Sequence, residues 1–227
     1  ADGNWPFQAA DCAPKSLRFD SYSPSGYLTR TPAVASNQRT WTWSGWVKRS
    51  IADGDWRALF TALNPDNSNR NDGIWFSGSS PEPDQIYISF GNNTDIQFSP
   101  KHRDSSAWFN ICVSVDTTRA ADQVQCFVNG EKLSIDSGNQ PTQNYQGGIN
   151  TAVSHSISRR DTSNAQFFDG YLSEIHFIDG QALSCEEFGF FDGQGIWQPK
   201  RFTGDYSNGT VYSNFVTGAH DTNHGWG

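Results

Sequence analysis

The chain has 227 residues, including 21 Gly and 10 Pro, and it carries 16 Phe, 9 Trp and 7 Tyr. So many large apolar residues exclude a disordered chain, and together with the chain-bending Gly and Pro they favour a β-rich fold. The formal net charge is −8, and no basic run is longer than a pair such as Arg159 and Arg160. Nucleic acids and anionic membranes are bound through basic surfaces, so we expect neither as the main partner. No apolar stretch approaches the roughly 18 to 20 residues that cross a bilayer, and we expect no membrane insertion.

Short segments rich in β-branched and aromatic residues, each bounded by Gly, Pro, Asn, Asp or Ser, follow one another along the chain. They predict strands at 16–19, 26–30, 40–49, 56–63, 73–77, 84–90, 95–99, 107–116, 123–128, 151–158, 166–178 and 210–215. Helical periodicity is nearly absent, so the pattern indicates an all-β sandwich or barrel. Ser184 and Glu187 match a capping box and predict one short helical piece there. We expect one domain over 1–215, with loops at 64–72 and 138–150, and a polar tail at 216–227.

Three tryptophans lie in the predicted strand 40–49. Trp41 and Trp43 share one face of this strand, whereas Trp46 has the opposite parity unless Gly45 marks a β-bulge. A row of indoles is one way to bind sugar rings. Because Trp is highly buried on average, we expect these side chains to fill the core of the fold instead.

Four cysteines, Cys12, Cys112, Cys126 and Cys185, allow three disulfide pairings and lack the C-x-x-C spacing of zinc sites. Residues 107–130 have a hairpin pattern in which Cys112 and Cys126 each lie seven residues from Arg119, the expected centre of the turn. Directly opposed residues have Cβ atoms about 4.5–5.5 Å apart, so this spacing predicts a Cys112–Cys126 bridge. Two buried free thiols, or a turn shifted by one residue, are the alternative. Cys12 and Cys185 would pair only if the terminal strands are neighbours.

Three runs of sequence carry a family resemblance. They are Ser16-Leu-Arg-Phe-Asp with Gly26-Tyr-Leu-Thr-Arg and Trp41-Thr-Trp-Ser-Gly-Trp-Val-Lys; Trp108-Phe-Asn-Ile-Cys-Val-Ser-Val-Asp-Thr-Thr with Cys126-Phe-Val-Asn-Gly; and Phe168-Asp-Gly-Tyr-Leu-Ser-Glu-Ile-His-Phe-Ile-Asp-Gly-Gln-Ala-Leu-Ser. Together they resemble the concanavalin A-like lectin/glucanase superfamily, in particular its laminin-G-like domains. A later run, Phe188-Gly-Phe-Phe-Asp with Gly195-Ile-Trp-Gln-Pro-Lys-Arg-Phe-Thr-Gly, is similar to a version found in structural and fibre proteins of marine bacteriophages.

The resemblance implies an all-β, two-sheet antiparallel jelly-roll sandwich whose terminal strands lie side by side. It therefore makes a second bridge feasible, and we expect Cys12–Cys185. It also implies display at the virion surface, which is an extracellular location, with other capsid or fibre proteins as partners. The sequence departs from the family pattern after Phe215, and its cysteines stand where aliphatic residues are expected.

The same superfamily contains glycoside hydrolases, whose retaining members place two carboxylates about 5–5.5 Å apart on one strand. The nearest match is the run from Glu174 to Asp179, in which His176 occupies the place of the central acid. Glu174 and Asp179 are five residues apart and point to opposite faces of a regular strand, unless a bulge at Phe177 or Ile178 intervenes. We therefore predict no catalytic residues.

The segment 66–72 offers oxygen ligands for calcium at Asp66, Asn67, Asn69 and Asp72. It lacks the bidentate Glu and the flanking helices of an EF-hand. The resemblance adds weight, because laminin-G-like domains often bind calcium. An ordinary solvated turn of Asn and Asp explains the same residues, and we commit to no metal and no cofactor.

Two classes of function follow from these observations. The first is a non-enzymatic module of a phage particle, either a capsid decoration or head-fibre protein or a tail-fibre domain, which can also grip host cell-surface glycans. The second is a glycoside hydrolase of the same fold. The missing pair of acids favours the first, and the sequence does not locate a glycan-binding site.

Overall fold

The computed structural model describes residues 16–22, 26–78, 82–91 and 94–206, with the backbone alone at 67–69. Cys12, the predicted strand 210–215 and the predicted tail 216–227 lie outside the described residues. The expectation of one domain over 1–215 therefore stays a prediction.

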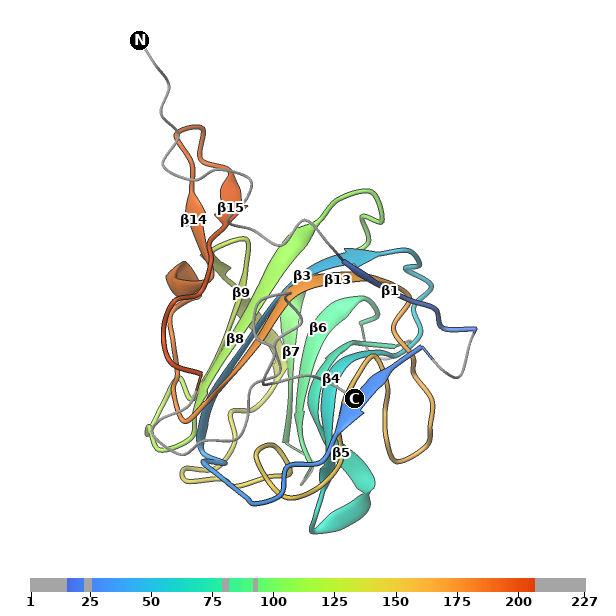
Figure 1. Ribbon diagram of the computed structural model, residues 1–227, viewed down its shortest axis with the longest axis vertical. Helices are drawn as coiled ribbons and strands as arrows, with labels where there is room; N and C mark the ends of the chain where they lie inside the picture. The colour runs from blue at the N-terminus through green and yellow to red at the C-terminus, as the bar shows by residue number, and fades with distance from the viewer. Residues whose placement is uncertain (1–15, 23–25, 79–81, 92–93, 207–227) are drawn as a thin grey trace.

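One of the two large sheets has six antiparallel strands in the order β1-β13-β3-β8-β9-β10 (Figure 1). Long strands form its centre, where β3 pairs with β13 from Trp41 to Arg49 and with β8 from Thr40 to Val47. The strands are β1 (Leu17–Phe19), β3 (Thr40–Arg49), β8 (Phe109–Asp116), β9 (Val124–Val128), β10 (Glu131–Lys132) and β13 (Gly170–Asp179).

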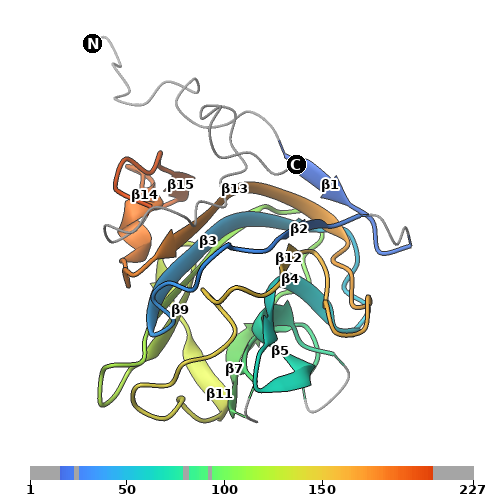
Figure 2. The same ribbon diagram turned by 60° about the horizontal axis from the view of Figure 1, so that its bottom comes forward.

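The second sheet has seven antiparallel strands in the order β11-β7-β6-β5-β4-β12-β2, and Figure 2 shows the two sheets as separate layers. Its strands are β2 (Leu28–Arg30), β4 (Arg57–Asn64), β5 (Asn67–Phe76), β6 (Gln85–Phe90), β7 (Thr94–Lys101), β11 (Ser134–Gly138) and β12 (His155–Ile157). Within the described part of the chain, no helix is long and apolar enough to span a membrane. The predicted all-β, two-sheet antiparallel sandwich is confirmed.

Segment 64–72 is not the loop that its polar composition predicts. Strand β4 continues to Asn64 and β5 starts at Asn67, so that only two residues separate the strands. The two strands pair from Arg57 and Phe76 down to Asn64 and Asn67. Cross-strand hydrogen bonds and the apolar neighbours outweigh the weak strand propensity of Asn and Asp.

A single apolar core lies between the sheets. Trp41 and Trp43 are buried in it, while Trp46 lies on the opposite face of β3, as its parity predicts. The bulge is in the partner strand, because the register of β13 against β3 shifts between Ser173 and His176. The indoles therefore fill the core, together with side chains that include Phe60, Ile74, Phe76, Ile86, Phe98, Val113 and Phe177.

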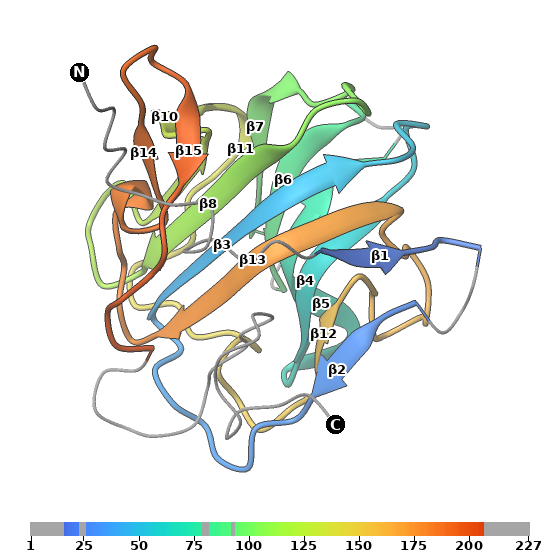
Figure 3. The same cartoon turned by 45° about the horizontal axis from the view of Figure 1, so that its top comes forward.

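A second, smaller apolar cluster covers part of the outer face of the six-stranded sheet. The predicted helical piece is a short 3-10 helix, η1 (Cys185–Glu187), whose N-cap is Ser184. A hairpin of β14 (Gly189–Phe191) and β15 (Trp197–Pro199) follows it and stands beyond the edge of the sheet in Figure 3. Side chains of this segment pack on Trp46, Cys112, Phe127 and Ile178.

The cysteines of the β8–β9 hairpin do not face each other. Cys112 is opposite Phe127, and Cys126 is opposite Val113, so the turn is shifted by one residue from the predicted centre. Cys126 lies on the same face as Val113, its cross-strand partner, whereas Cys112, the neighbour of Val113, points to the other face. Cys126 is therefore in the core and Cys112 in the outer cluster. The predicted Cys112–Cys126 bridge is wrong, and both residues are buried free thiols. Cys185 is also a buried free thiol, which contradicts the expected Cys12–Cys185 bridge; Cys12 itself lies outside the described residues.

A buried ion pair joins the two sheets at the end of β3. The guanidinium of Arg49 donates to the Asp84 carboxylate over 2.8 Å and to the His102 carbonyl over 2.6 Å, and it lies 4.3 Å from the ring centre of Phe76. Arg103 donates to the other oxygen of Asp84 over 2.9 Å. Burial would raise the pKa of Asp84, but the hydrogen bonds from Arg103 and Arg49 outweigh it, and the pKa lies below its usual value.

The folded state therefore binds a proton on Asp84 less tightly than the unfolded state does. The contribution of Asp84 to stability is complete above the unfolded pKa of about 4 and is lost as the pH falls through the lower folded pKa. Replacing Asp84 by Asn leaves the Arg49 charge buried without its partner. Loss of one member of a buried pair costs about 3–5 kcal/mol, and we expect that decrease in unfolding free energy at pH 7.

Urea denaturation of wild type and Asp84→Asn at pH 7 and pH 2.5 measures this decrease in unfolding free energy. The difference between wild type and the variant should shrink at pH 2.5, because this pH lies below the unfolded pKa of about 4 and part of the contribution of Asp84 is lost there. Arg103→Gln is the control, because Arg103 is about half exposed and an exposed pair contributes only about 0–1 kcal/mol. Equal losses in the two variants would contradict the assignment.

The free thiols give a second expectation. Burial raises the pKa of the Cys112 and Cys126 thiols, which therefore stay protonated and react slowly in the folded protein. Iodoacetamide in non-reducing denaturant should alkylate Cys112, Cys126 and Cys185, whereas the native protein should resist it. Peptide mapping that recovers Cys112 linked to Cys126 would contradict the observed register.

Candidate functional site

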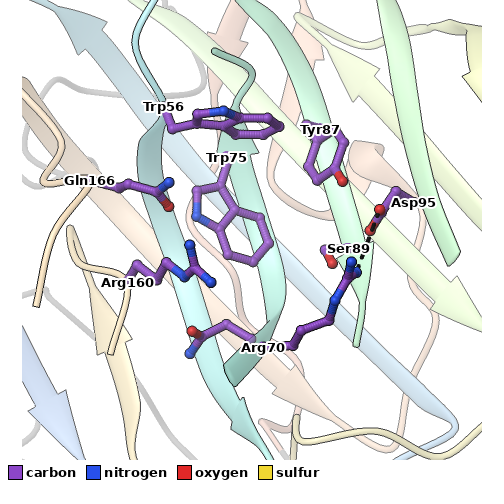
Figure 4. Close-up of a pocket in the computed structure, with 9 residues that line it drawn as sticks. Trp56, Arg70, Trp75, Tyr87, Ser89, Asp95, Arg160 and Gln166 are labelled. Carbon is purple, nitrogen blue, oxygen red and sulfur yellow. Dashed lines mark ion pairs between the residues drawn. The ribbon is translucent and has the colours of Figure 1, made fainter. Parts of the chain in front are cut away.

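A pocket of about 310 Å³ lies on the outer face of the seven-stranded sheet (Figure 4). In β5 and β6, the side chains that alternate with the core residues Ile74, Phe76, Ile86 and Ile88 point away from the core. The residues that line the pocket are Trp56, Arg70, Asn71, Trp75, Tyr87, Ser89, Asp95, Arg160 and Gln166.

Aromatic rings form the floor and one wall of the pocket. Trp75 of β5 and Tyr87 of β6 are directly opposite each other, and their rings meet edge to face with centres 6.2 Å apart. Trp56, just before β4, meets Tyr87 edge to face at 4.7 Å. A side chain at Gly78 would be impossible in this arrangement, because its Cβ would lie 2.3 Å from Cδ1 of Trp56. The glycine thus lets the indole of Trp56 lie against the backbone at the rim of the pocket.

Charged and polar groups line the rest of the pocket. Arg70 and Asp95 approach each other to 3.8 Å, which is an ion pair but not a hydrogen bond. Burial, together with the neighbouring Asp95 carboxylate, raises the pKa of the Tyr87 phenol, so the hydroxyl keeps its proton. Arg160 and Gln166 come from the loop between β12 and β13.

Several hydrogen bonds hold this loop against the sheet, and two of them lie near the pocket. The amide N–H of Thr162 donates to the side-chain oxygen of Asn71 over 3.4 Å, and the N–H of Ala58 donates to the carbonyl of Gln166 over 2.8 Å. A further hydrogen bond, from Nε of Arg160 to the Thr162 hydroxyl over 2.8 Å, orients the Arg160 side chain. Residues about 100 positions apart therefore line one small pocket.

Three buried polar atoms around this pocket have no hydrogen-bond partner in the described part of the chain. They are the indole nitrogen of Trp75, the amide nitrogen of Asn71 and one carboxylate oxygen of Asp95. Trp75 and Asn71 are each only 4% exposed. A buried polar group without a partner costs about 1–3 kcal/mol, so each of these atoms needs a partner such as a water molecule or a polar ligand. In Figure 4 the Trp75 nitrogen lies on the side of Gln166 and Arg160.

None of these lining residues was identified from the sequence. A signal existed in residues 85–90, where Tyr87 and Ser89 alternate with three core side chains. In the run Ile74-Trp75-Phe76 all three residues are apolar, so the sequence does not show which of them faces outward. The contributions of Arg70, Arg160 and Gln166 depend on how the loops fold back over the sheet.

The structure does not bring the candidate acids of β13 together. Glu174 lies in the bulge and approaches Nε2 of His176 to 3.4 Å on the outer face, and the Tyr206 hydroxyl is 2.9 Å from Nδ1 of the same ring. Asp179 is buried on the inner face, where it accepts from the side chain of Asn150 over 2.8 Å. The bulge lies at 174–175 rather than at Phe177 or Ile178, and it leaves the two carboxylates on opposite faces.

Asp72, one of the four calcium candidates, points into the protein. Its carboxylate accepts from the backbone N–H groups of Gly91 and Gly148, each over 2.6 Å, and from the Asn64 amide over 3.0 Å. Burial raises the pKa of Asp72, although these hydrogen bonds oppose the effect. N–H donors occupy the oxygens that a cation would need. Asp66 lies exposed in the turn, and the side chains of Asn67 and Asn69 are outside the described set. Among the described residues, no group of three or more His, Cys, Asp or Glu is placed to hold a metal ion.

Two solved structures with a similar fold are distant from this chain in sequence. A heptameric, serum-amyloid-P-like pentraxin from Limulus polyphemus superposes with a TM-score of 0.55 at 13% identity, covering 78% of this chain and 80% of the pentraxin. The CBM40 of the Ruminococcus gnavus IT-sialidase, in complex with α2,3-sialyllactose, gives a TM-score of 0.50 at 13% identity, covering 70% of this chain and 95% of that one. No curated protein sequence matches the chain. At these identities the likeness shows the fold alone.

The family is shown by sequence. A laminin G family model, described as the concanavalin A-like lectin/glucanases superfamily, matches residues 22–188. The match begins before β2 and ends at the residue after η1, so it includes nearly all of both large sheets. The chain therefore belongs to the laminin-G-like branch of the concanavalin A-like lectin/glucanase superfamily.

Proposed function

We propose that the protein is a non-enzymatic carbohydrate-binding module, and that it acts at the surface of a bacteriophage particle. The observation that carries the first part is the pocket on the outer face of the seven-stranded sheet. It combines aromatic rings with three buried polar atoms that lack partners among the described residues.

A saccharide fits both features of the pocket. A sugar ring presents C–H groups on its faces, which pack against aromatic rings, and hydroxyl groups at its edge, which both donate and accept hydrogen bonds. Trp56 and Tyr87 are partly exposed and offer the aromatic surfaces. Hydroxyls at the ring edge would hydrogen-bond to the polar groups that line the pocket, which include the Gln166 amide and the Arg70 and Arg160 guanidinium groups. A volume of about 310 Å³ is at the small end of ligand sites and suits one or two sugar rings.

Binding without cleavage is the better interpretation of the acidic residues. Retaining hydrolysis needs a nucleophile and a separate acid or base on the same patch. Asp95 is the one carboxylate that lines the pocket, and it is engaged with Arg70 and Tyr87. The pair Glu174 and Asp179 is divided between two faces of the other sheet. The fold is also that of a module solved with sialyllactose, which supports a binding role by analogy of fold only.

The role of the aromatic wall can be tested by Trp56→Ala. Wild-type protein on an array of bacterial surface polysaccharides and mammalian-type oligosaccharides should bind a subset of them and release no reducing ends. Trp56→Ala should weaken binding to that subset at least about tenfold, which corresponds to about 1.4 kcal/mol.

Trp108→Ala is the matched control, because Trp108 is 38% exposed and precedes β8 of the other sheet. It should bind as wild type does. Equal loss in the two variants would contradict the pocket as the site, and turnover of any polysaccharide would contradict the non-enzymatic role.

The virion location rests on the resemblance of residues 188–204 to phage structural and fibre proteins. In the fold this run forms β14 and β15, which cover part of one sheet face and leave Phe191 and Ile196 exposed at the hairpin. Exposed apolar side chains suit contact with other proteins of the particle, such as capsid or fibre subunits. We expect antibodies against the chain to label intact particles in electron micrographs, and an averaged map to place it on the head or on the tail. Particles that lack the chain would contradict the proposal.

A further inference from the structure

We infer that the pocket selects saccharides that carry an acidic group, and that Arg70 and Arg160 hold this group. The inference rests on the proposed carbohydrate-binding function and adds the chemical class of the ligand. Three observations carry it: the charge of the pocket, the kind of hydrogen-bonding atoms that it leaves without partners, and the placement of the two arginines.

The pocket is locally positive on an acidic protein. Two arginines and one aspartate line it, which gives a net charge of +1, whereas the whole chain carries −8. Arg70 and Asp95 form an ion pair at 3.8 Å without a hydrogen bond, so Arg70 keeps N–H donors that Asp95 does not use. A neutral ligand would use none of this charge. An anionic ligand would gain from it, and the gain is larger in a partly enclosed site than in open water.

Donors outnumber acceptors among the groups that face the pocket. The buried N–H of Trp75 and the amide N–H of Asn71 have no partner among the described residues, whereas Asp95 leaves one acceptor. Arg70 has five N–H donors, and its pairing with Asp95 involves one nitrogen. Such a set matches a ligand rich in acceptors. The planar guanidinium of arginine also fits the two oxygens of a carboxylate or sulfate.

The placement of these groups suggests an orientation for the ligand. In the view of Figure 4, Arg70 and Arg160 lie on the opposite side of the Trp75 indole from Trp56. The loop that carries Arg160 is tied to β5 through Thr162 and Asn71, so the arginine is held near the strand from which Trp75 projects. A sugar ring against Trp56 and Tyr87 would thus direct its acidic group toward the two guanidinium groups.

The experiment compares glycans that differ only in the acidic group. The full chain is titrated with matched pairs: uronic acid oligosaccharides and their carboxyl-reduced forms, sialylated oligosaccharides and their asialo forms, and sulfated oligosaccharides and their desulfated forms. We expect at least one acidic member to bind about tenfold or more tightly than its neutral counterpart. This preference should decrease as sodium chloride is raised, because salt screens the attraction. The pairs also distinguish carboxylate from sulfate as the recognised group.

Arg70→Gln should abolish the preference, so that the acidic member binds no more tightly than its neutral counterpart, while Arg70→Lys should keep part of it. Arg119→Gln is the matched control, since Arg119 is an exposed arginine in the β8–β9 turn, and it should bind as wild type does. Melting temperatures of all variants check that the fold is retained.

Equal binding of the acidic and neutral members would overturn this inference and leave the proposed carbohydrate-binding function standing. An acidic preference that survives Arg70→Gln would overturn the assignment to Arg70. Absence of binding to every glycan, acidic or neutral, would overturn the proposed function itself and this inference with it.

Discussion

The buried ion pair between Arg49 and Asp84 is the contact on which the arrangement of the two sheets depends most directly. It joins the end of β3 in one sheet to the residue just before β6 in the other, and it lies against Phe76 at the end of β5. The N–H of Asp84 also donates to the carbonyl of Ser77, just beyond β5. In the middle of β5, Asp72 accepts from the backbone at Gly91 and Gly148. The strand that carries Trp75 is thus held by one buried carboxylate at its C-terminal end and by another in its middle.

Such fixing matters for a binding site, because a pocket that is already ordered loses little conformational entropy when a ligand enters. The aromatic rings of the pocket hold one another through edge-to-face contacts, and the β12–β13 loop is hydrogen-bonded to β4 and β5. Along β5 and β6, successive side chains point to opposite faces of the sheet. One parity fills the core, and the other supplies the ligand-facing groups, so stability and binding use the same strands without competing for the same side chains.

The two outer faces of the sandwich differ in how they are used. The apolar cluster of η1 and the β14–β15 hairpin covers part of the six-stranded sheet. This hairpin is formed by the run 188–204, whose sequence resembles phage structural and fibre proteins. The pocket lies on the outer face of the seven-stranded sheet. A module that attaches through one face and binds glycans through the other would use both features at once, in keeping with the proposed role at a particle surface.

The sequence by itself determined the fold class, the family and the strand over residues 40–49. Strands can be recognised in a sequence because core packing selects a regular alternation of large apolar residues, and this pattern is local. It also separated Trp46 from Trp41 and Trp43 by parity alone. Only the tertiary structure decided the rest. The Cys112–Cys126 prediction failed because the register depends on the geometry of one turn, and a shift of one residue sends a side chain to the other face. The sequence did not reveal the pocket for a related reason. Its residues extend from Trp56 to Gln166, and they are brought together by the order of strands in the sheet and by one loop that folds back over it. A local sequence pattern encodes neither of these.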